Sequence, residues 1–242
     1  MNSKVKRNII QFILLSIIFT GSELYGINPI VAGSTPVNLN NRDTLKDNQI
    51  LYNGRIWKNL YYMVQGDQFL FSTMFLPGSL TIRGKSFENI SIMYDLYKDE
   101  ILTPVSPGIM LQLNKEMVDS FSIIFQNKTY HFTRFPEDSL EGLKGYVNLL
   151  YRGKISLYIK YSKKIDRQKT EGENDKFYLI TRIYLMKDNK VSLINGKSDL
   201  FKVFIEDKAQ IKDFIKRNRL LVSKNEPESF IPVIKYYDSI SQ

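Results

Sequence analysis

A series of short segments in which apolar and polar residues alternate dominates the middle of this 242-residue chain. Alternation with a period of two gives each segment one apolar face, as in a β-strand that covers a core on one side. The connections between them are short, so neighbouring strands are expected to be antiparallel. Turns are predicted at Gly84-Lys85, Asn127-Lys128, Arg152-Gly153 and Asp188-Asn189. The segments are residues 80–83, 90–94, 109–113, 121–126, 130–132, 146–151, 155–161, 177–186 and 191–194.

The apolar spacing becomes helical after Gly196. Asp207, with Gln210 three residues later, resembles a capping box and predicts a helix start. A shorter helix capped by Ser198 is expected before it, and a last helix is expected to start at Ser229 with Pro232 in its first turn. The sequence therefore predicts an α+β fold that is mainly antiparallel β, either a meander-type sheet or a partly open barrel, with helices from about residue 198. In the last helix three residues are expected to face the sheet: Phe230, Ile234 and Tyr237.

The first 22 residues have the pattern of an export signal peptide. Three basic residues precede an apolar run over residues 9–20, and small residues follow it. The run is shorter than the ~20 residues that span a bilayer, which favours a cleaved signal over a retained anchor. Cleavage is expected between residues 22 and 33, and residues 23–48 are polar and turn-prone, as in a flexible leader. We expect an exported protein with one β-rich domain over residues 49–242.

The amino-acid composition limits the kinds of catalysis and metal binding that are open to this protein. The chain has no cysteine, which excludes disulfides, thiol catalysis and cysteine-ligated zinc. Its one histidine, His131, cannot form a multi-histidine metal site, and it is expected to be a partly exposed strand residue. The formal net charge of +9 is expected to serve mainly solubility, with an anionic lipid headgroup, glycan or wall polymer as the alternative. No nucleic-acid motif is present, and neither a cofactor nor a metal is expected.

An aromatic cluster near the start of the expected domain is the one candidate ligand site. Trp57, Tyr61 and Tyr62 combine apolar area with polar tips and could form a platform for a sugar ring or a peptide. Packing within the sheet and core is the more common role for such residues. No catalytic residue is predicted.

Three carboxylates gather in one connection, at Asp95, Asp99 and Glu100. Two carboxylates held apart across a cleft can hydrolyse a glycoside, and oxygen-rich loops can hold calcium. The connection lacks regular calcium-loop spacing and Lys98 interrupts it, so a solvated hairpin loop is the favoured interpretation.

Two tripeptides resemble the end of a phosphate-binding loop, Gly84-Lys85-Ser86 and Gly196-Lys197-Ser198. Neither has the required glycine five residues before its Gly-Lys pair, and both are interpreted as turns.

Several stretches spread over the expected domain carry a resemblance to a known family. They are Leu51-Tyr-Asn-Gly-Arg-Ile-Trp-Lys-Asn-Leu-Tyr-Tyr, Gly66-Asp-Gln-Phe-Leu-Phe, Phe75-Leu-Pro-Gly-Ser, Ile92-Met-Tyr-Asp-Leu-Tyr-Lys-Asp-Glu-Ile, Asp207-Lys-Ala-Gln-Ile and Pro232-Val-Ile-Lys-Tyr-Tyr. Over roughly residues 50–240 the chain resembles a family of exported proteins from Bacteroidetes-type bacteria that has no assigned activity. The resemblance implies an envelope location in a Gram-negative cell, in the periplasm or associated with the outer membrane, and it supplies no catalytic residues.

These observations lead to an expected function of a non-enzymatic binding or accessory protein of the cell envelope. The expected partner is another envelope protein or a glycan or wall polymer, with peripheral association with the outer membrane as one mode. The alternatives are a carboxylate-dependent hydrolase acting on glycans and a small outer-membrane barrel. The helical C-terminal end and the basic residues within the strands argue against the barrel.

Overall fold

The computed structural model describes residues 49–136, 142–167 and 174–241. The predicted signal peptide and nearly all of the predicted leader lie outside these residues. The described strands are β1 (Gly54–Ile56), β2 (Leu76–Ile82), β3 (Lys85–Asp95), β4 (Glu100–Ser106), β5 (Ile109–Leu113), β6 (Val118–Phe125), β7 (Lys128–Phe135), β8 (Gly145–Arg152), β9 (Ser156–Asp166), β10 (Lys176–Lys187) and β11 (Lys190–Ile194). The described helices are η1 (Lys115–Met117), α2 (Lys197–Val203), α3 (Lys208–Arg217), η2 (Pro227–Phe230) and α4 (Ile231–Ile240).

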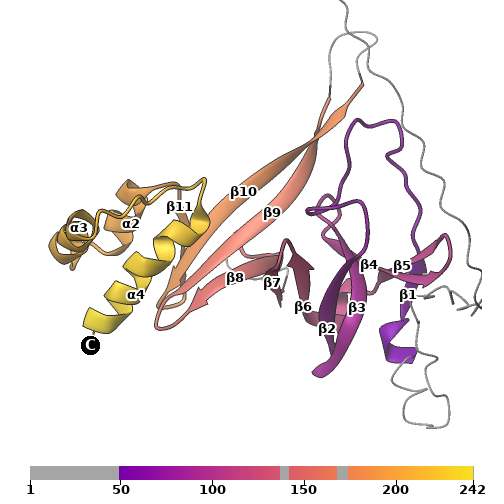
Figure 1. The fold of residues 1–242 in the computed structure, drawn as a ribbon, viewed down its shortest axis with the longest axis horizontal. Coiled ribbons are helices and arrows are strands. Elements are labelled where there is room, and N and C mark those ends of the chain that lie inside the picture. The colour runs from indigo at the N-terminus through magenta and orange to yellow at the C-terminus, as the bar shows by residue number, and fades with distance from the viewer. Residues whose placement is uncertain (1–48, 137–141, 168–173, 242) are drawn as a thin grey trace, which may run out of the picture. The chain divides into compact units, whose positions relative to one another are not determined.

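All of these strands form one antiparallel sheet in the order β1-β5-β4-β3-β2-β6-β7-β8-β9-β10-β11 (Figure 1). Two meanders make it up, because β2 to β5 run outward in one direction and β6 to β11 in the other. The chain returns through η1 to place β6 beside β2. The sheet stays open, with β1 and β11 as its edges, so the meander-type prediction is confirmed and the sheet is not closed into a barrel.

Strand β3 changes its pairing partner along its length. Its first part pairs with β2 up to Ile92, and its last three residues, from Met93 to Asp95, pair with β4. The β2–β3 register shifts between Gly78 and Leu80, and Asn89 has a left-handed φ of 56°. Such irregularities bend a strand, which suits a strand that changes partner along its length.

One of the four predicted turns lies at the predicted pair, since Asp188 and Asn189 both have positive φ, as a two-residue hairpin turn requires. In the β2–β3 and β6–β7 hairpins the central pair begins one residue earlier than predicted, at Arg83 and at Gln126. The predicted turn at Arg152 is wrong, because Arg152 still belongs to β8 and pairs with Ser156 of β9. The charged composition from Ser162 to Asp175 predicts a loop, but β9 continues to Asp166, because its pairing with β10 extends that far.

Buried residues form a core on each face of the sheet. One face of β9, β10 and β11 packs against the C-terminal helices, with Leu157 and Leu185 fully buried. On the opposite face of the same strands, Tyr158 and Tyr184 pack with Leu143 and Val147. The expectation of one apolar face per strand is therefore wrong for β9, which is covered on both faces. A third cluster lies over β2 to β8, where Phe132 stacks on Phe121 with ring centroids 4.6 Å apart.

The C-terminal helices follow the prediction in position and differ from it in capping. Helix α3 starts directly after Asp207, whose side chain makes no capping hydrogen bond. Ser198 is not a cap, because it lies inside α2, whose N-cap is Gly196. Ser229 is not the start of the last helix, because η2 already begins at Pro227. The last helix begins as the 3₁₀ helix η2 and continues as α4, with Pro232 in the first turn of α4. Helix α2 follows β11 after Gly196, so this segment joins a strand to a helix and is not the simple turn that was predicted. The three apolar residues expected to face the sheet are all buried: Phe230, Ile234 and Tyr237.

Candidate functional site

A pocket of about 260 Å³ lies between the chain that follows β1 and the hairpin formed by β3 and β4. It brings together two of the three aromatic residues singled out from the sequence, Trp57 and Tyr61, and two of the three carboxylates, Asp95 and Glu100. Its other lining residues are Arg55, Ile56, Lys58, Leu60, Gln68, Lys98 and Gln112.

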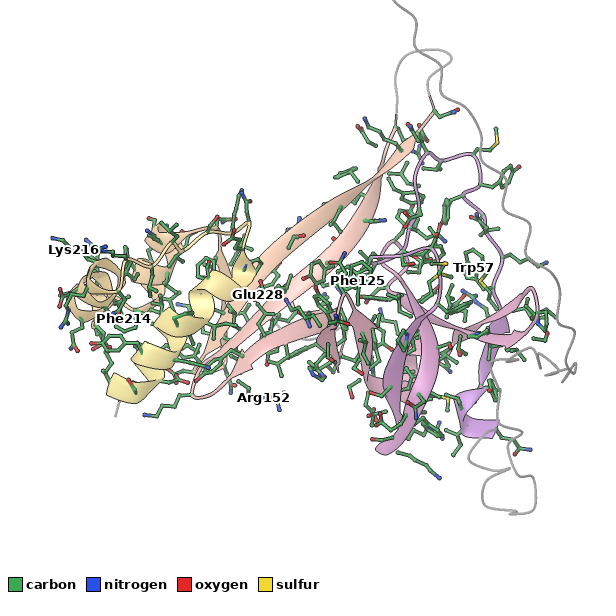
Figure 2. All side chains as sticks on the ribbon, viewed as in Figure 1. Trp57, Phe125, Arg152, Phe214, Lys216 and Glu228 are labelled. Atoms are coloured by element: carbon green, nitrogen blue, oxygen red, sulfur yellow. The ribbon has the colours of Figure 1, made fainter. Side chains whose placement is uncertain are left out.

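Pairing of the edge strand β1 with β5 positions the first wall of this pocket. Gly54 lies opposite Leu113, and a Cβ atom at Gly54 would be 2.1 Å from the carbonyl oxygen of Gln112, so only glycine allows this approach. The pairing continues past the strand, because the Trp57 N–H donates to the carbonyl of Met110 at 2.9 Å. The backbone around Trp57 is therefore fixed to β5. Figure 2 labels the Trp57 side chain, which lies at the end of the sheet away from α4.

The aromatic wall is held by contacts with other rings. Trp57 is half-buried and packs at a tilt against Phe69, with centroids 5.9 Å apart. Tyr61 is half-buried and makes edge contacts with Tyr97 at 4.9 Å and Phe177 at 5.9 Å. Edge and tilted packing leaves part of each ring available to a ligand.

Tyr62 does not join this wall. Its side chain is 78% exposed, and it is not among the residues that line the pocket. The structure thus brings together two of the three predicted platform residues, Trp57 and Tyr61, and places Tyr62 outside.

Planar polar side chains form the second wall. The Arg55 Nε donates to Oε1 of Gln112 at 2.9 Å, and Arg55 Nη2 lies 3.6 Å from Oε1 of Glu100. Burial raises the pKa of Glu100, and the charge of Asp95 raises it further, while Arg55 opposes this shift. These groups offer both hydrogen-bond donors and acceptors at fixed positions.

Lys98 adds a cation beside the aromatic rings. Its Nζ lies 5.5 Å from the centre of the Tyr61 ring and 5.3 Å from that of Tyr97. A hydrogen bond to Tyr61 raises the pKa of Lys98, so the ammonium group stays charged at neutral pH.

Asp95 is a buried turn residue, which corrects the prediction of a solvated hairpin loop. Its Oδ1 accepts hydrogen bonds from the N–H groups of Tyr97 and Lys98, each at 2.9 Å, and its Oδ2 accepts one from Gln68 at 3.1 Å. Burial raises the pKa of Asp95, and these hydrogen bonds counteract part of the rise. Asp95 therefore contributes to the pocket lining, but both of its carboxylate oxygens already accept hydrogen bonds from protein groups.

Asp99 is also not a solvated loop residue, and it is not part of the pocket. It has a left-handed φ of 58° and lies 2.8 Å from Nζ of Lys115 and 3.2 Å from Nζ of Lys160. The Tyr94 hydroxyl and the Tyr146 N–H also donate to it. Burial alone would raise the pKa of Asp99, but the two lysines and Tyr94 outweigh it, so the pKa is lowered. Asp99 thereby ties the β3–β4 turn to η1, β8 and β9.

Sequence reasoning did not identify Arg55, Gln112 or Lys98 as members of this site. Gln112 lies 57 residues after Arg55, and the two meet only because β1 pairs with β5. The alternation over residues 109–113 indicated a strand, but it carried no signal for the partner of that strand.

The other sequence-derived candidates lie elsewhere. His131 is exposed on β7, as predicted. Among the described residues, no group of three or more His, Cys, Asp or Glu side chains is placed to hold a metal ion. In the same part of the chain, no helix is both long enough and apolar enough to cross a membrane. In comparisons with known proteins, no family model, no curated protein and no solved structure matches this chain.

Proposed function

We propose that the protein is a non-enzymatic glycan-binding protein of the cell envelope, exported through its N-terminal signal, and that it binds a sugar residue in the pocket between Trp57 and Glu100. The observation that carries this proposal is the joining of a two-ring aromatic wall to a wall of planar polar side chains in one concave site.

Sugar rings present two kinds of surface, and this pocket has a counterpart for each. The C–H faces of a pyranose pack against aromatic rings such as those of Trp57 and Tyr61. Its hydroxyls pair with planar groups that donate and accept in fixed directions, which Arg55, Gln112 and Glu100 provide. The volume of about 260 Å³ lies just below the range of roughly 300–1,000 Å³ usual for small-molecule sites, which suits one sugar unit.

The geometry supports binding more than hydrolysis. Asp95 is fully buried and its oxygens are occupied by Gln68 and two backbone N–H groups. Asp99 is held by Lys115 and Lys160 away from the pocket. Among the three carboxylates, this leaves Glu100 as the one placed to meet a ligand, whereas glycoside hydrolysis uses a pair.

Trp57→Ala is expected to weaken glycan binding at least tenfold, because it removes the larger ring of the aromatic wall. Tyr62→Ala is the matched control, since it removes an aromatic residue five positions later that lies outside the pocket. The measurement is binding of the purified mature protein to an array of peptidoglycan fragments, lipopolysaccharide core oligosaccharides and plant and host polysaccharides. Thermal melts of both variants check that each is folded.

The proposal fails if the folded wild type binds no glycan on the array, or if the two variants lose binding equally. Arg55→Ala provides a second test on the polar wall that leaves both rings in place. It is expected to lower affinity for the same glycans that Trp57→Ala affects.

Incubation of the wild type with the bound glycan is expected to release no new reducing ends, which tests the hydrolase alternative. Glu100→Gln is expected to alter affinity only. New reducing ends from the wild type that Glu100→Gln abolishes would replace the binding proposal with a hydrolase.

A protein partner is the second candidate function, and exposed apolar residues beside the pocket favour it. Ile56 and Leu60 line the pocket rim and are 63% and 70% exposed, and Tyr62 and Met63 continue this surface along the chain. Contiguous exposed apolar residues mark interaction sites. Crosslinking in cells tests it with Met63→Lys, which changes this surface outside the pocket lining. A membrane-protein partner that is lost in this variant while glycan binding is retained would make the surface an accessory-subunit interface.

A further inference from the structure

The outer edge of β10 is only partly covered. β10 pairs with β9 without a register shift from Lys176 to Met186, but β11 covers β10 only from Ile183 to Lys187. Residues 176–182 therefore have no strand neighbour on the side away from β9 within the described part of the chain.

One backbone contact at the start of this edge fixes which groups point outward. The N–H of Phe177 donates to the carbonyl of Gln65 at 3.0 Å, and the N–H of Gln65 donates to the carbonyl of Asp175 at 2.7 Å. In an antiparallel strand the N–H and C=O groups of alternate residues point to the same side. The groups of Leu179 and Thr181 therefore also point outward.

These outward groups lie in a gap between two pairings. Gln65 closes one end at Phe177, and Ile194 of β11 closes the other by pairing with Ile183. Within the described residues, no segment pairs with the outward groups of Leu179 and Thr181. At about 3.4 Å per residue the gap measures roughly 20 Å, which leaves room for three to five residues of extended chain.

The middle of this gap lacks the usual protection of an edge strand. Natural edges are blunted by proline, by bulges or by charged side chains. Residues 177–181 contain none of these, while Tyr178 and Leu179 are 42% and 52% exposed. The only charged residues of the stretch, Lys176 and Arg182, stand at its ends.

A pocket of about 410 Å³ adjoins the Thr181 end of the gap. Ile183 and Ile194 contribute apolar surface to it, and Lys224 and Asn225 line it from the loop before η2. Two internal hydrogen bonds stabilise this loop. The Ser223 N–H donates to Oγ of Ser229 at 2.9 Å, and the Asn225 N–H donates to Oγ of Ser223 at 3.2 Å. Lys224 and Asn225 are thus presented from a fixed turn.

The charges around this pocket favour an acidic side chain. Arg182 and Lys224 are among its lining residues and no carboxylate is, and neither cation has an ion-pair partner in the described chain. Burial raises the pKa of Tyr161, which also lines this pocket, and the charge of Glu228 raises it further. Glu228 is itself paired with Lys128, which balances its charge.

We propose that an extended peptide segment of a partner protein adds as a strand to the free edge of β10 between Gln65 and Ile194, with an acidic side chain in the pocket beside Thr181. Backbone bonds to Leu179 and Thr181 supply affinity, and the pocket supplies sequence preference, as in other complexes formed by strand addition. The pocket beside Thr181 shares no lining residue with the glycan pocket, although Phe177 at the other end of the gap contacts Tyr61.

Selection from a phage-displayed library of random heptapeptides on the folded mature protein tests this proposal. The enriched peptides are expected to carry an Asp or Glu and to bind Leu179→Pro at least tenfold more weakly than wild type. Proline at this position removes an outward N–H and no bond to β9, so the sheet is expected to survive. Lys224→Glu is expected to remove the preference for the acidic residue, whereas Lys190→Glu, a charge reversal on β11, leaves it unchanged.

Hydrogen exchange gives a second readout that is independent of affinity. The amides of Leu179 and Thr181 are expected to become protected when a selected peptide binds. The proposal is overturned if no peptide is enriched, if binding is indifferent to Leu179→Pro, or if the protein forms a dimer that Leu179→Pro dissolves, since the occupant would then be a second copy of this chain.

Discussion

Asp99→Asn is expected to lower the free energy of unfolding by about 2–4 kcal/mol, because it removes the charge that balances two partly buried lysines. Lys115 and Lys160 both lie within 3.2 Å of the Asp99 carboxylate. Asparagine keeps the left-handed φ at low cost and retains one acceptor oxygen, so the loss reflects charge more than shape. Urea unfolding followed by circular dichroism measures it.

Asp95→Asn is the matched control, since it changes the same group only four residues away. The pKa of Asp95 is raised by burial, so the ionised form already carries a cost in the folded protein. The asparagine side chain introduced there would still accept hydrogen bonds from the two backbone N–H groups. Once the Gln68 amide flips, so that its oxygen and nitrogen exchange places, the new side-chain NH₂ group would donate to the Gln68 side-chain carbonyl oxygen. The variant is therefore expected to stay within about 1 kcal/mol of wild type. Equal losses at the two positions would contradict the opposed roles assigned to them.

The pH dependence separates the two aspartates further. The pKa of Asp99 is lowered in the folded protein, so its stabilising contribution is present above about pH 4 and is lost as the pH falls through the lowered pKa. The difference between wild type and Asp99→Asn is expected to shrink below pH 4. The pKa of Asp95 is raised in the folded protein, so the folded state favours the protonated carboxyl. The contribution of Asp95 to the free energy of unfolding is therefore present at low pH and is lost as the pH rises through the raised pKa.

Gly78→Ala is expected to destabilise the protein by about 3 kcal/mol or more, because it forces two central strands apart. A Cβ atom at Gly78 would lie 2.0 Å from the carbonyl oxygen of Ser122 on β6 and 3.1 Å from Cδ1 of Ile92 on β3. The first of these is a backbone atom in the middle of the sheet, which cannot move aside as a surface side chain can. Thermal and urea unfolding measure the loss.

Gly84→Ala is the control for this substitution. Gly84 has a φ of 76° and nothing within 4 Å of its missing Cβ, so alanine there meets backbone strain and no clash. The expected cost is about 1–2 kcal/mol. A smaller effect at Gly78 than at Gly84 would mean that β2 and β6 are not packed as closely as described.

The strands and their antiparallel order were predictable because alternation and turn residues are local signals. The hairpin at Asp188 and Asn189 is visible in the sequence as a turn between two alternating segments, and it forms as predicted. Helix positions after Gly196 were predictable for the same reason. What local patterns did not show is that β9 is covered on both faces, since Tyr158 resembles a polar-face residue until Tyr184 is placed against it.

The candidate site was only half predictable. Trp57 and Tyr61 carry a compositional signal, whereas Gln112 becomes part of the site through a pairing over 57 residues. The prediction that Asp99 is a solvated loop residue is wrong because its partners are remote in sequence. Lys160 lies 61 residues away and is brought to it by β9.

The pairing of β1 with β5 also has a consequence for the order of folding. β1 has three residues, and closing the chain between Arg55 and Gln112 costs loop entropy before any contact of the aromatic wall forms. Hairpins such as β10–β11 can form early from neighbouring residues, and we expect β1 to dock last and to open first. A sugar that binds only when β1 is paired with β5 would therefore stabilise this pairing and make the opening of the N-terminal edge less frequent.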